Sequence, residues 1–314
     1  MIRTVVSVGL PVTETMHIKK NRLMPEGRGV QESSLKRICV VTGIHGDELE
    51  GQYICYELIR RLNEKPEHLA GIVDIYPCVN PLGMEAIVRR VPTFDLDMNR
   101  SFPGSLEGDM SEYAAARLME DMAGADFCVD LHASDIFLRE IPQVRLAREQ
   151  EHLMEYAKLL NTEFVWIHSS PTVQPASLYH CLNAAGVPTL AVEMGVGMRI
   201  TKQFGDQILE GLFCLMKRLG IWTGETIEPK EPIISTQGSE VALIHAEASG
   251  VFLPNVEHWR DIRKGDTVGD IVNSLTGEIE QHIIAPCDGV VFTLREYPVV
   301  YRGSLIARIL GGEG

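Results

Sequence analysis

Short apolar runs alternate with segments of helical period over the first two thirds of the chain. The apolar runs are typical of buried strands, and we expect strands at Arg37–Thr42, Ile72–Pro77, Asp126–Leu131, Glu163–Ile167 and Val187–Glu193. Apolar residues at helical spacing predict helices at Glu48–Asn63, Ser111–Met122 (with Ser111 as N-cap), Arg148–Leu160, Leu178–Ala185 and Lys202–Leu219. This alternation predicts an α/β fold: a mostly parallel mixed sheet with helices on both faces.

The pattern changes after about residue 223. Residues 224–235 are polar and carry two prolines, as is typical of a linker. No helical period follows, and short β-type runs separated by Gly and Asp predict strands at Gly250–Leu253, Thr267–Val272, Gly277–Ala285, Gly289–Leu294 and Ser304–Ile309. We therefore expect a larger domain over 1–223, a linker over 224–235 and a small all-β domain over 236–314.

Composition narrows the classes of function. Of the 314 residues, 45% are hydrophobic and 23% charged, as in ordinary globular proteins. The formal net charge of −14 argues against nucleic acid or an anionic membrane as a partner. No apolar run approaches the roughly 18–20 residues of a membrane helix, and we find no convincing signal peptide. The seven cysteines show no Cys-x-x-Cys spacing, which favours reduced, buried thiols and a cytoplasmic protein.

Four polar motifs follow or end predicted strands. They are His45–Glu48, Asp97–Gly104, Asp130–Ser134 and Ala191–Gly195. In open α/β sheets, ligands bind outside the carboxyl ends of the strands, so residues far apart in sequence can meet there. We expect these motifs to line one crevice.

The residue types in the crevice suit a catalytic zinc ion. Zinc in such sites takes about three nitrogen or oxygen ligands and leaves a position open; His45, Glu48 and His132 supply two imidazoles and a carboxylate. Glu193, at a strand end, is the candidate to take a proton from water and deliver it to a leaving amine. His-x-x-Glu spacing alone is weak evidence: His152 and Glu155 share it without a preceding strand, and we expect them on a solvated helix face.

Over roughly residues 38–220 the sequence resembles the succinylglutamate desuccinylase/aspartoacylase family, which belongs with the zinc carboxypeptidases. The resemblance is carried, in order, by GIHGDELEG, NPLGMEA, DMNRSFPG, DLHAS and AVEMG. It implies one zinc ion on His45, Glu48 and His132, and Glu193 as the residue that activates water. It also implies that Asn99 and Arg100 hold a substrate carboxylate, although an Asn-Arg pair is also common in structural loops.

An arginine upstream of DMNR usually assists in that family. Arg89 and Arg90 are adjacent here, and we favour Arg90 without excluding Arg89. Tyr179 and Arg145 are further candidates for the pocket, with a structural or surface position as the alternative.

The C-terminal part also has a resemblance. APCDGVV and VVYRGSLIARI are similar to the barrel-sandwich shape of biotinyl and lipoyl carrier domains. Those domains attach their cofactor to a lysine at a hairpin tip, but this chain has no lysine after Lys264. We therefore expect a barrel-sandwich domain that caps the crevice or supports a homo-oligomer interface, not a carrier.

The sequence predicts hydrolysis of the amide of a small N-acyl amino acid. A zinc carboxypeptidase acting on short peptides is the nearest alternative, because pocket loops decide substrate size. A catalytically silent metal-binding or scaffold protein is the second. The acyl group and the amino acid stay open among N-succinylglutamate, N-acetylaspartate, N-acetyl-diaminobutyrate and others.

Overall fold

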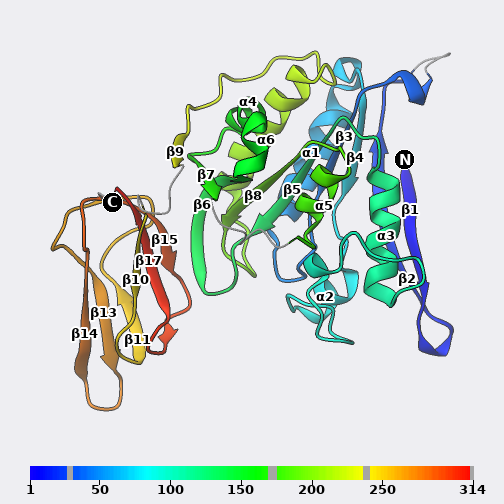
Figure 1. The fold of residues 1–314 in the computed structure, drawn as a ribbon. Coiled ribbons are helices and arrows are strands. Elements are labelled where there is room, and N and C mark those ends of the chain that lie inside the picture. The colour runs from blue at the N-terminus through cyan, green and yellow to red at the C-terminus, as the bar shows by residue number, and fades with distance from the viewer. Residues whose placement is uncertain (27–30, 169–174, 236–240, 312–314) are drawn as a thin grey trace.

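The computed structural model describes residues 1–26, 31–168, 175–235 and 241–311 (Figure 1). Within them, the larger sheet contains 13 strands: β1 (Ile2–Gly9), β2 (Thr15–Leu23), β3 (Arg37–Val41), β4 (Ile72–Tyr76), β5 (Phe127–Ala133), β6 (Leu138–Ala147), β7 (Phe164–His168), β8 (Thr189–Gly195), β9 (Ile233–Ser235), β10 (Val241–His245), β12 (Asp261–Ile262), β15 (Gly289–Arg295) and β17 (Leu305–Leu310). Its main path runs β1-β2-β4-β3-β5-β8-β6-β15-β17-β10.

The centre of this sheet is parallel. Strands β4, β3, β5 and β8 pair in parallel, so their carboxyl ends meet at one edge, as the sequence predicts. The hairpin of β1 and β2 extends one side in antiparallel pairing, and β6 joins β8 in antiparallel pairing on the other. The fold is therefore a mixed α/β fold whose parallel centre leads into three of the predicted motifs, His45–Glu48, Asp130–Ser134 and Ala191–Gly195, while Asp97–Gly104 lies in the long loop that follows β4 and α2.

Helices cover both faces of the sheet, as predicted. The α-helices are α1 (Glu50–Glu64), α2 (Pro81–Ala86), α3 (Met110–Met122), α4 (Met154–Ala157), α5 (Leu178–Ala184) and α6 (Lys202–Arg218). Helices α1 and α6 pack with alternate strand residues such as Val40 and Val129 in one buried core. Helices α3 and α5 pack with the intervening residues, such as Cys39 and Cys128, in a second core on the opposite face. No helix in the described residues is long and apolar enough to cross a membrane.

Short 3-10 helices account for one wrong prediction. They lie at Pro11–Thr13, Glu32–Ser34, Pro66–His68, Met98–Arg100, Arg148–Leu153 and Lys158–Leu160. The helix predicted over Arg148–Leu160 is therefore broken, since only α4 is α-helical there. Leu153, Ala157 and Leu160 are nevertheless buried in the α1/α6 core, so the apolar pattern reflects burial without one continuous helix.

Two helix starts differ from the prediction. Asp109, not Ser111, is the N-cap of α3: its side chain accepts hydrogen bonds from the backbone N–H groups of Ser111 and Glu112. The Glu112 side chain in turn accepts one from the Asp109 N–H, which completes a capping box. Helix α1 begins at Glu50, two residues after the predicted start. Glu48 lies in the turn before it, where its carboxylate is free to face the site.

The C-terminal part consists of antiparallel strands, as expected of an all-β segment. A second sheet has the order β14-β13-β11-β16, formed by β11 (Gly250–Pro254), β13 (Thr267–Asn273), β14 (Glu278–Ile284) and β16 (Val299–Val300). Side chains from both sheets, among them Phe252, Val268 and Ile306, share one core. The segment predicted as a linker contributes β9, which pairs in parallel with β7.

The C-terminal strands are joined to the larger sheet. Strand β15 pairs with β6 through Thr293 opposite Glu140, Leu294 opposite Arg139 and Arg295 opposite Leu138. In Figure 1 the red C-terminal strands β15 and β17 lie nearest the green strand β6. This pairing brings C-terminal side chains close to the strands that carry the predicted site.

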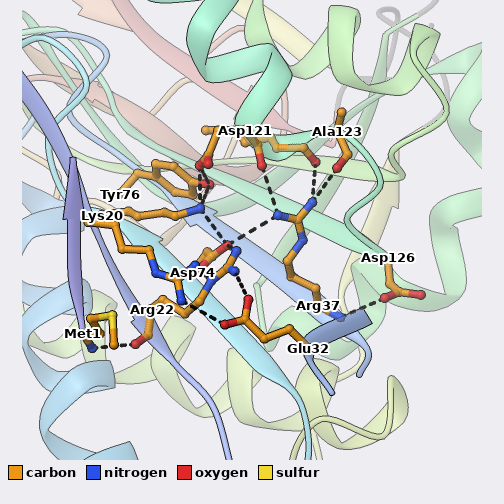
Figure 2. Close-up of polar contacts among 12 residues, drawn as sticks. Met1, Lys20, Arg22, Glu32, Arg37, Asp74, Tyr76, Asp121, Ala123 and Asp126 are labelled. Carbon is orange, nitrogen blue, oxygen red and sulfur yellow. Dashed lines mark hydrogen bonds and ion pairs between the residues drawn. The ribbon is translucent and has the colours of Figure 1, made fainter. Parts of the chain in front are cut away.

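A buried charge cluster fixes the N-terminal hairpin to the sheet (Figure 2). Lys20 and Arg22 point inward from β2 and are buried. The fully buried carboxylate of Asp74, on β4, accepts hydrogen bonds from both side chains, at 3.1 Å from Lys20 Nζ and 2.7 Å from Arg22 Nε. Burial raises the pKa of Asp74, but its two cationic partners outweigh that effect and the net pKa is lowered.

Replacing Asp74 with Asn is expected to lower the free energy of unfolding by about 3–5 kcal/mol, because Lys20 and Arg22 lose their shared, fully buried counter-charge and keep only the more exposed carboxylates of Asp121 and Glu32. Urea unfolding followed by circular dichroism measures this. Lys36→Ala removes the exposed ion pair with Asp126 and serves as the control, with little change expected. Equal effects of the two substitutions would contradict the structural role given to Asp74.

Candidate metal and catalytic site

The turn after β3 places His45 and Glu48. Both side chains are buried although they lie outside regular secondary structure. Gly46 makes the turn possible, because a Cβ there would lie 2.0 Å from the backbone carbonyl carbon of Gly83 in α2. The Glu48 N–H donates to the His45 carbonyl oxygen at 3.4 Å and closes the turn. The glycine after the histidine in the motif thus reflects close packing of this turn against α2.

The three predicted metal ligands converge. His45 Nδ1 lies 2.7 Å from Glu48 Oε1, and His132 Nδ1 lies 2.9 Å from Glu48 Oε2. One donor atom from each residue lies within 4.8 Å of the other two, which is a spacing that can hold a metal ion. The prediction that these residues meet at the carboxyl edge is therefore confirmed, while their role as ligands stays a prediction.

Each imidazole has a carboxylate on its other nitrogen. His45 Nε2 lies 3.1 Å from Asp97 Oδ1, and His132 Nε2 lies 3.1 Å from Asp130 Oδ2 in an ion-pair contact. Histidines that bind metals usually have a carboxylate or a carbonyl oxygen at the second nitrogen, which fixes the ring and its tautomer. A proton on Nε2 leaves the Nδ1 lone pair of each ring free for a cation.

The electrostatics of this cluster favour positive charge. Burial lowers the pKa of both imidazoles, but Glu48 with Asp97 or Asp130 outweighs burial, and both pKa values are raised. Burial raises the pKa of Glu48, yet the two imidazoles outweigh it and the net pKa is lowered. Three carboxylates thus surround two imidazoles in a water-poor pocket, and a divalent cation would balance that charge.

Glu193 lies on the strand next to His132. The two residues are register partners in the parallel pairing of β5 and β8, so their side chains leave the sheet on the same side. Gly195, which has a φ of +62°, ends β8, and a Cβ there would lie 1.9 Å from Glu50 Oε1. Burial raises the pKa of Glu193, and Arg145 opposes that effect from 3.2 Å without cancelling it. A carboxyl group with a raised pKa beside a metal pocket is suited to proton transfer.

The two adjacent arginines point to different partners. Arg89 Nη1 donates to Glu48 Oε1 at 2.6 Å, next to the metal pocket. Arg90, favoured from the sequence, pairs at 3.0 Å with Asp95, whose side chain is 82% exposed. The structure therefore brings Arg89, and not Arg90, to the predicted ligands, while substrate contact by either stays a prediction.

Asn99 and Arg100 lie in a short 3-10 helix beside the site. The side-chain oxygen of Asn99 accepts a hydrogen bond from the Leu178 N–H at 2.9 Å, which leaves its amide nitrogen to donate elsewhere. Arg100 is partly exposed and donates to the Asn99 carbonyl oxygen at 2.7 Å. Asp97 caps this helix and also contacts His45, so one residue links this loop to the metal pocket.

Of the two further pocket candidates, Arg145 and Tyr179, only Arg145 contacts a predicted site residue. Arg145 belongs to the site through Glu193, whereas the Tyr179 hydroxyl bonds to the Ala147 N–H and to Gln150. His152 and Glu155 are exposed, as predicted, and Glu155 pairs with Arg218.

Sequence reasoning missed four polar residues around this site. Asp97 and Asp130 sit within the quoted motifs, and the Asp-x-His spacing on a strand places Asp130 on the same face as His132, a signal that was available. Glu140 lies outside every motif, and Arg308 lies in VVYRGSLIARI, which indicated only the C-terminal domain; no sequence signal connects the two residues.

Comparison with known proteins agrees with this geometry. The model of the succinylglutamate desuccinylase/aspartoacylase catalytic domain matches residues 34–219, more than half of the chain. The site geometry and this match define a hydrolase that acts on amide bonds. The chain belongs to the succinylglutamate desuccinylase/aspartoacylase family.

Individual relatives support the same placement. N-alpha-acetyl-L-2,4-diaminobutyric acid deacetylase of Halomonas elongata is 26% identical over 279 residues, which cover 85% of this chain and 80% of that protein. A succinylglutamate desuccinylase/aspartoacylase from Rhodobacter sphaeroides has the same fold, with a TM-score of 0.80 at 21% identity, covering 99% and 96% of the two chains. The product-bound ectoine utilization protein EutE from Ruegeria pomeroyi has a TM-score of 0.81 at 19% identity, covering 99% and 95%. The whole length, including the C-terminal strands, thus follows a known architecture.

Proposed function

We propose that this protein is a zinc-dependent amidohydrolase that removes the acyl group from a small N-acyl amino acid. The observation that carries the proposal is the convergence of His45, Glu48 and His132, whose donor atoms lie within 4.8 Å of one another. The family match and the Halomonas deacetylase support an N-acyl amino acid as the substrate class.

The donor set fits zinc. Two imidazole nitrogens and one carboxylate are typical of catalytic zinc sites that leave a position open, and Asp97 and Asp130 hold the second nitrogens of the two imidazoles. A bound zinc ion would polarise the amide carbonyl and lower the pKa of a nearby water. His45, Glu48 and His132 would hold it, one ion in each subunit.

Glu193 is the proton carrier in this proposal. Its raised pKa allows its carboxylate to accept a proton from the attacking water and, once protonated, to give that proton to the leaving amine. The Arg145 contact keeps the Glu193 side chain in place during both transfers. Its 18% side-chain exposure leaves it accessible to water and substrate.

Charged groups around the pocket suit an anionic substrate. In this proposal Arg100 and the amide nitrogen of Asn99 bind the amino acid carboxylate, as a guanidinium and a donor amide do elsewhere. The Arg89 guanidinium, which contacts Glu48, would stabilise negative charge that develops on the carbonyl oxygen.

Two further expectations belong to this proposal. Residues 236–314 would form a barrel-sandwich domain after a linker at 224–235 that contains β9, and the enzyme would act in the cytoplasm. The seven cysteines, all free and five of them buried, are consistent with a reducing compartment.

A panel of substrates tests the proposed function. Zinc-loaded protein should release amine from N-acetyl or N-succinyl amino acids and not from short peptides. Release from peptides instead would favour the carboxypeptidase alternative. No release from any member of the panel, with zinc bound, would favour a catalytically silent protein.

Arg89 and Arg90 provide a matched pair of variants. Arg89→Gln is expected to lower kcat by about hundredfold, the scale seen when a donor to a developing oxyanion is lost. Arg90→Gln, which removes an exposed pair with Asp95, should leave kcat within about twofold. Steady-state kinetics on the best panel substrate measures both. The reverse order of effects would assign the role to Arg90.

A further inference from the structure

A C-terminal arginine reaches a buried carboxylate of the catalytic sheet. Arg308 lies on β17, and its Nη1 donates to Glu140 Oε1 on β6 at 2.5 Å. Glu140 is 2% exposed, and 168 residues of chain separate the two partners. Burial raises the pKa of Glu140, but the two guanidiniums around it outweigh burial, so its net pKa is lowered. Glu140 therefore stays charged inside the protein only because cations hold it there.

The second of these cations also holds Glu193. Arg145 Nη2 donates to Glu140 Oε2 at 2.6 Å, and Arg145 Nη1 donates to Glu193 Oε1 at 3.2 Å. One guanidinium is thus shared between a buried carboxylate and the proposed proton carrier. Because its shorter bond goes to Glu140, the position of Arg145 depends on how Glu140 is satisfied.

Arg308, Glu140, Arg145 and Glu193 form one connected cluster of charges. The guanidinium carbons of Arg145 and Arg308 lie 6.0 Å and 5.6 Å from the ring centroid of Trp166, so both cations lie against one aromatic side chain. Gln143, the other partner of Glu140, is neutral and donates to Glu140 Oε2 at 2.5 Å. In this cluster two guanidiniums balance two carboxylates, and removing Arg308 leaves Arg145 as the single cation for both Glu140 and Glu193.

We propose that Arg308 is a positioning residue for Glu193, acting through Glu140 and Arg145. Arg308 satisfies one oxygen of Glu140, so that Arg145 can divide its guanidinium between Glu140 and Glu193. Without Arg308, the buried charge of Glu140 draws both Arg145 nitrogens to itself, and Glu193 loses its fixed orientation. The inference rests on the proposed function, because it assigns Glu193 the proton transfers. It makes Arg308, from the C-terminal segment, a contributor to the orientation of Glu193.

Arg308→Gln tests this inference in the full-length zinc-loaded protein. We expect kcat to fall about tenfold or more, since small displacements of a catalytic group carry penalties of up to about hundredfold. KM and zinc content should stay within about twofold, because Arg308 is neither one of the predicted metal ligands nor one of the residues proposed to bind substrate. Arg308→Lys keeps a cation for Glu140, and should recover most of the lost kcat. Thermal unfolding of each variant shows the folded fraction to which kcat is referred.

Two controls separate this role from simple stabilisation. Arg302→Gln changes an exposed arginine of the same C-terminal segment and should leave kcat unchanged. In an Arg145→Gln background, Arg308→Gln should have no further effect on kcat, because the path to Glu193 is already broken.

The outcomes are distinct. Three results would overturn this inference and leave the proposed function standing, provided that the unsubstituted protein is active and Glu193→Gln is not. The first is an Arg308→Gln variant with the same kcat as Arg302→Gln, and the second is a folded Arg308→Lys variant as impaired as Arg308→Gln. The third is an equal loss of kcat on Arg308→Gln substitution with and without Arg145. An inactive unsubstituted protein, or an active Glu193→Gln variant, would overturn the proposed function and this inference with it.

Discussion

Replacing Glu193 with Gln should lower kcat for amide hydrolysis by about 10³-fold to 10⁴-fold, at the upper end of what general acid–base catalysis contributes. Gln has nearly the same shape, but its amide can neither accept a proton from water nor deliver one to the leaving amine. The substitution removes the proton carrier while the predicted metal ligands stay in place, because Glu193 is not among them.

The zinc content of the variant distinguishes this explanation from loss of the metal. Glu193→Gln protein should bind zinc as the unsubstituted protein does and retain its KM within a few-fold. Glu155→Gln is a suitable control, because Glu155 is an exposed glutamate paired with Arg218 outside the site, and its kcat should not change. A Glu193→Gln variant with at least a tenth of the original kcat would remove Glu193 from the mechanism.

The central fold was predictable because its residues obey simple periodicities. The strands of the parallel centre are mostly apolar, since both of their faces lie under helices, and the buried Asp74 in β4 and Asp130 in β5 are the mid-strand exceptions. The polar residues His132 and Glu193 lie near the carboxyl ends of β5 and β8, which is where ligands bind in such sheets. The convergence of His45, Glu48 and His132 could therefore be predicted from the sequence.

The strands that were missed break the apolar pattern for a physical reason. Strand β2 points Lys20 and Arg22 inward, where an apolar residue is expected, because the buried Asp74 on the neighbouring strand β4 compensates them. Strand β6 likewise buries Glu140 and Gln143 in the cluster that ends at Glu193. A buried charge can be recognised only together with its partner. Asp74 lies more than 50 residues after Lys20 in the sequence, and Arg308 lies 168 residues after Glu140.

Some residues of the candidate site could likewise not be assigned from the sequence alone. Sequence spacing identified two adjacent arginines but not which one turns toward Glu48, since that depends on the loop conformation between α2 and Asp97. The sequence identified Arg145 only as one possible pocket residue. Nothing in the sequence relates Arg145 to Glu193 until β6 and β8 are known to be neighbouring strands.

Loss of the metal should abolish activity. We expect His132→Ala to bind no zinc at the concentrations that saturate the unsubstituted protein, because two ligands remain of three, and to show no measurable hydrolysis. Removing zinc from the unsubstituted protein with a chelator should have the same effect, and added zinc should restore activity. His152→Ala is the matched control: His152 has the same spacing to Glu155 as His45 has to Glu48, but it is exposed.

A milder substitution tests the carboxylate that contacts a predicted metal ligand. Asp130→Asn keeps all three ligands but weakens the partner of His132 Nε2, and should reduce zinc affinity or kcat by about tenfold to hundredfold. Zinc content measured by plasma mass spectrometry, together with kcat at saturating zinc, separates loss of affinity from loss of turnover. If His132→Ala retained zinc and activity, the metal centre would lie elsewhere. If Asp130→Asn matched His132→Ala in severity, Asp130 would itself have to be counted among the ligands.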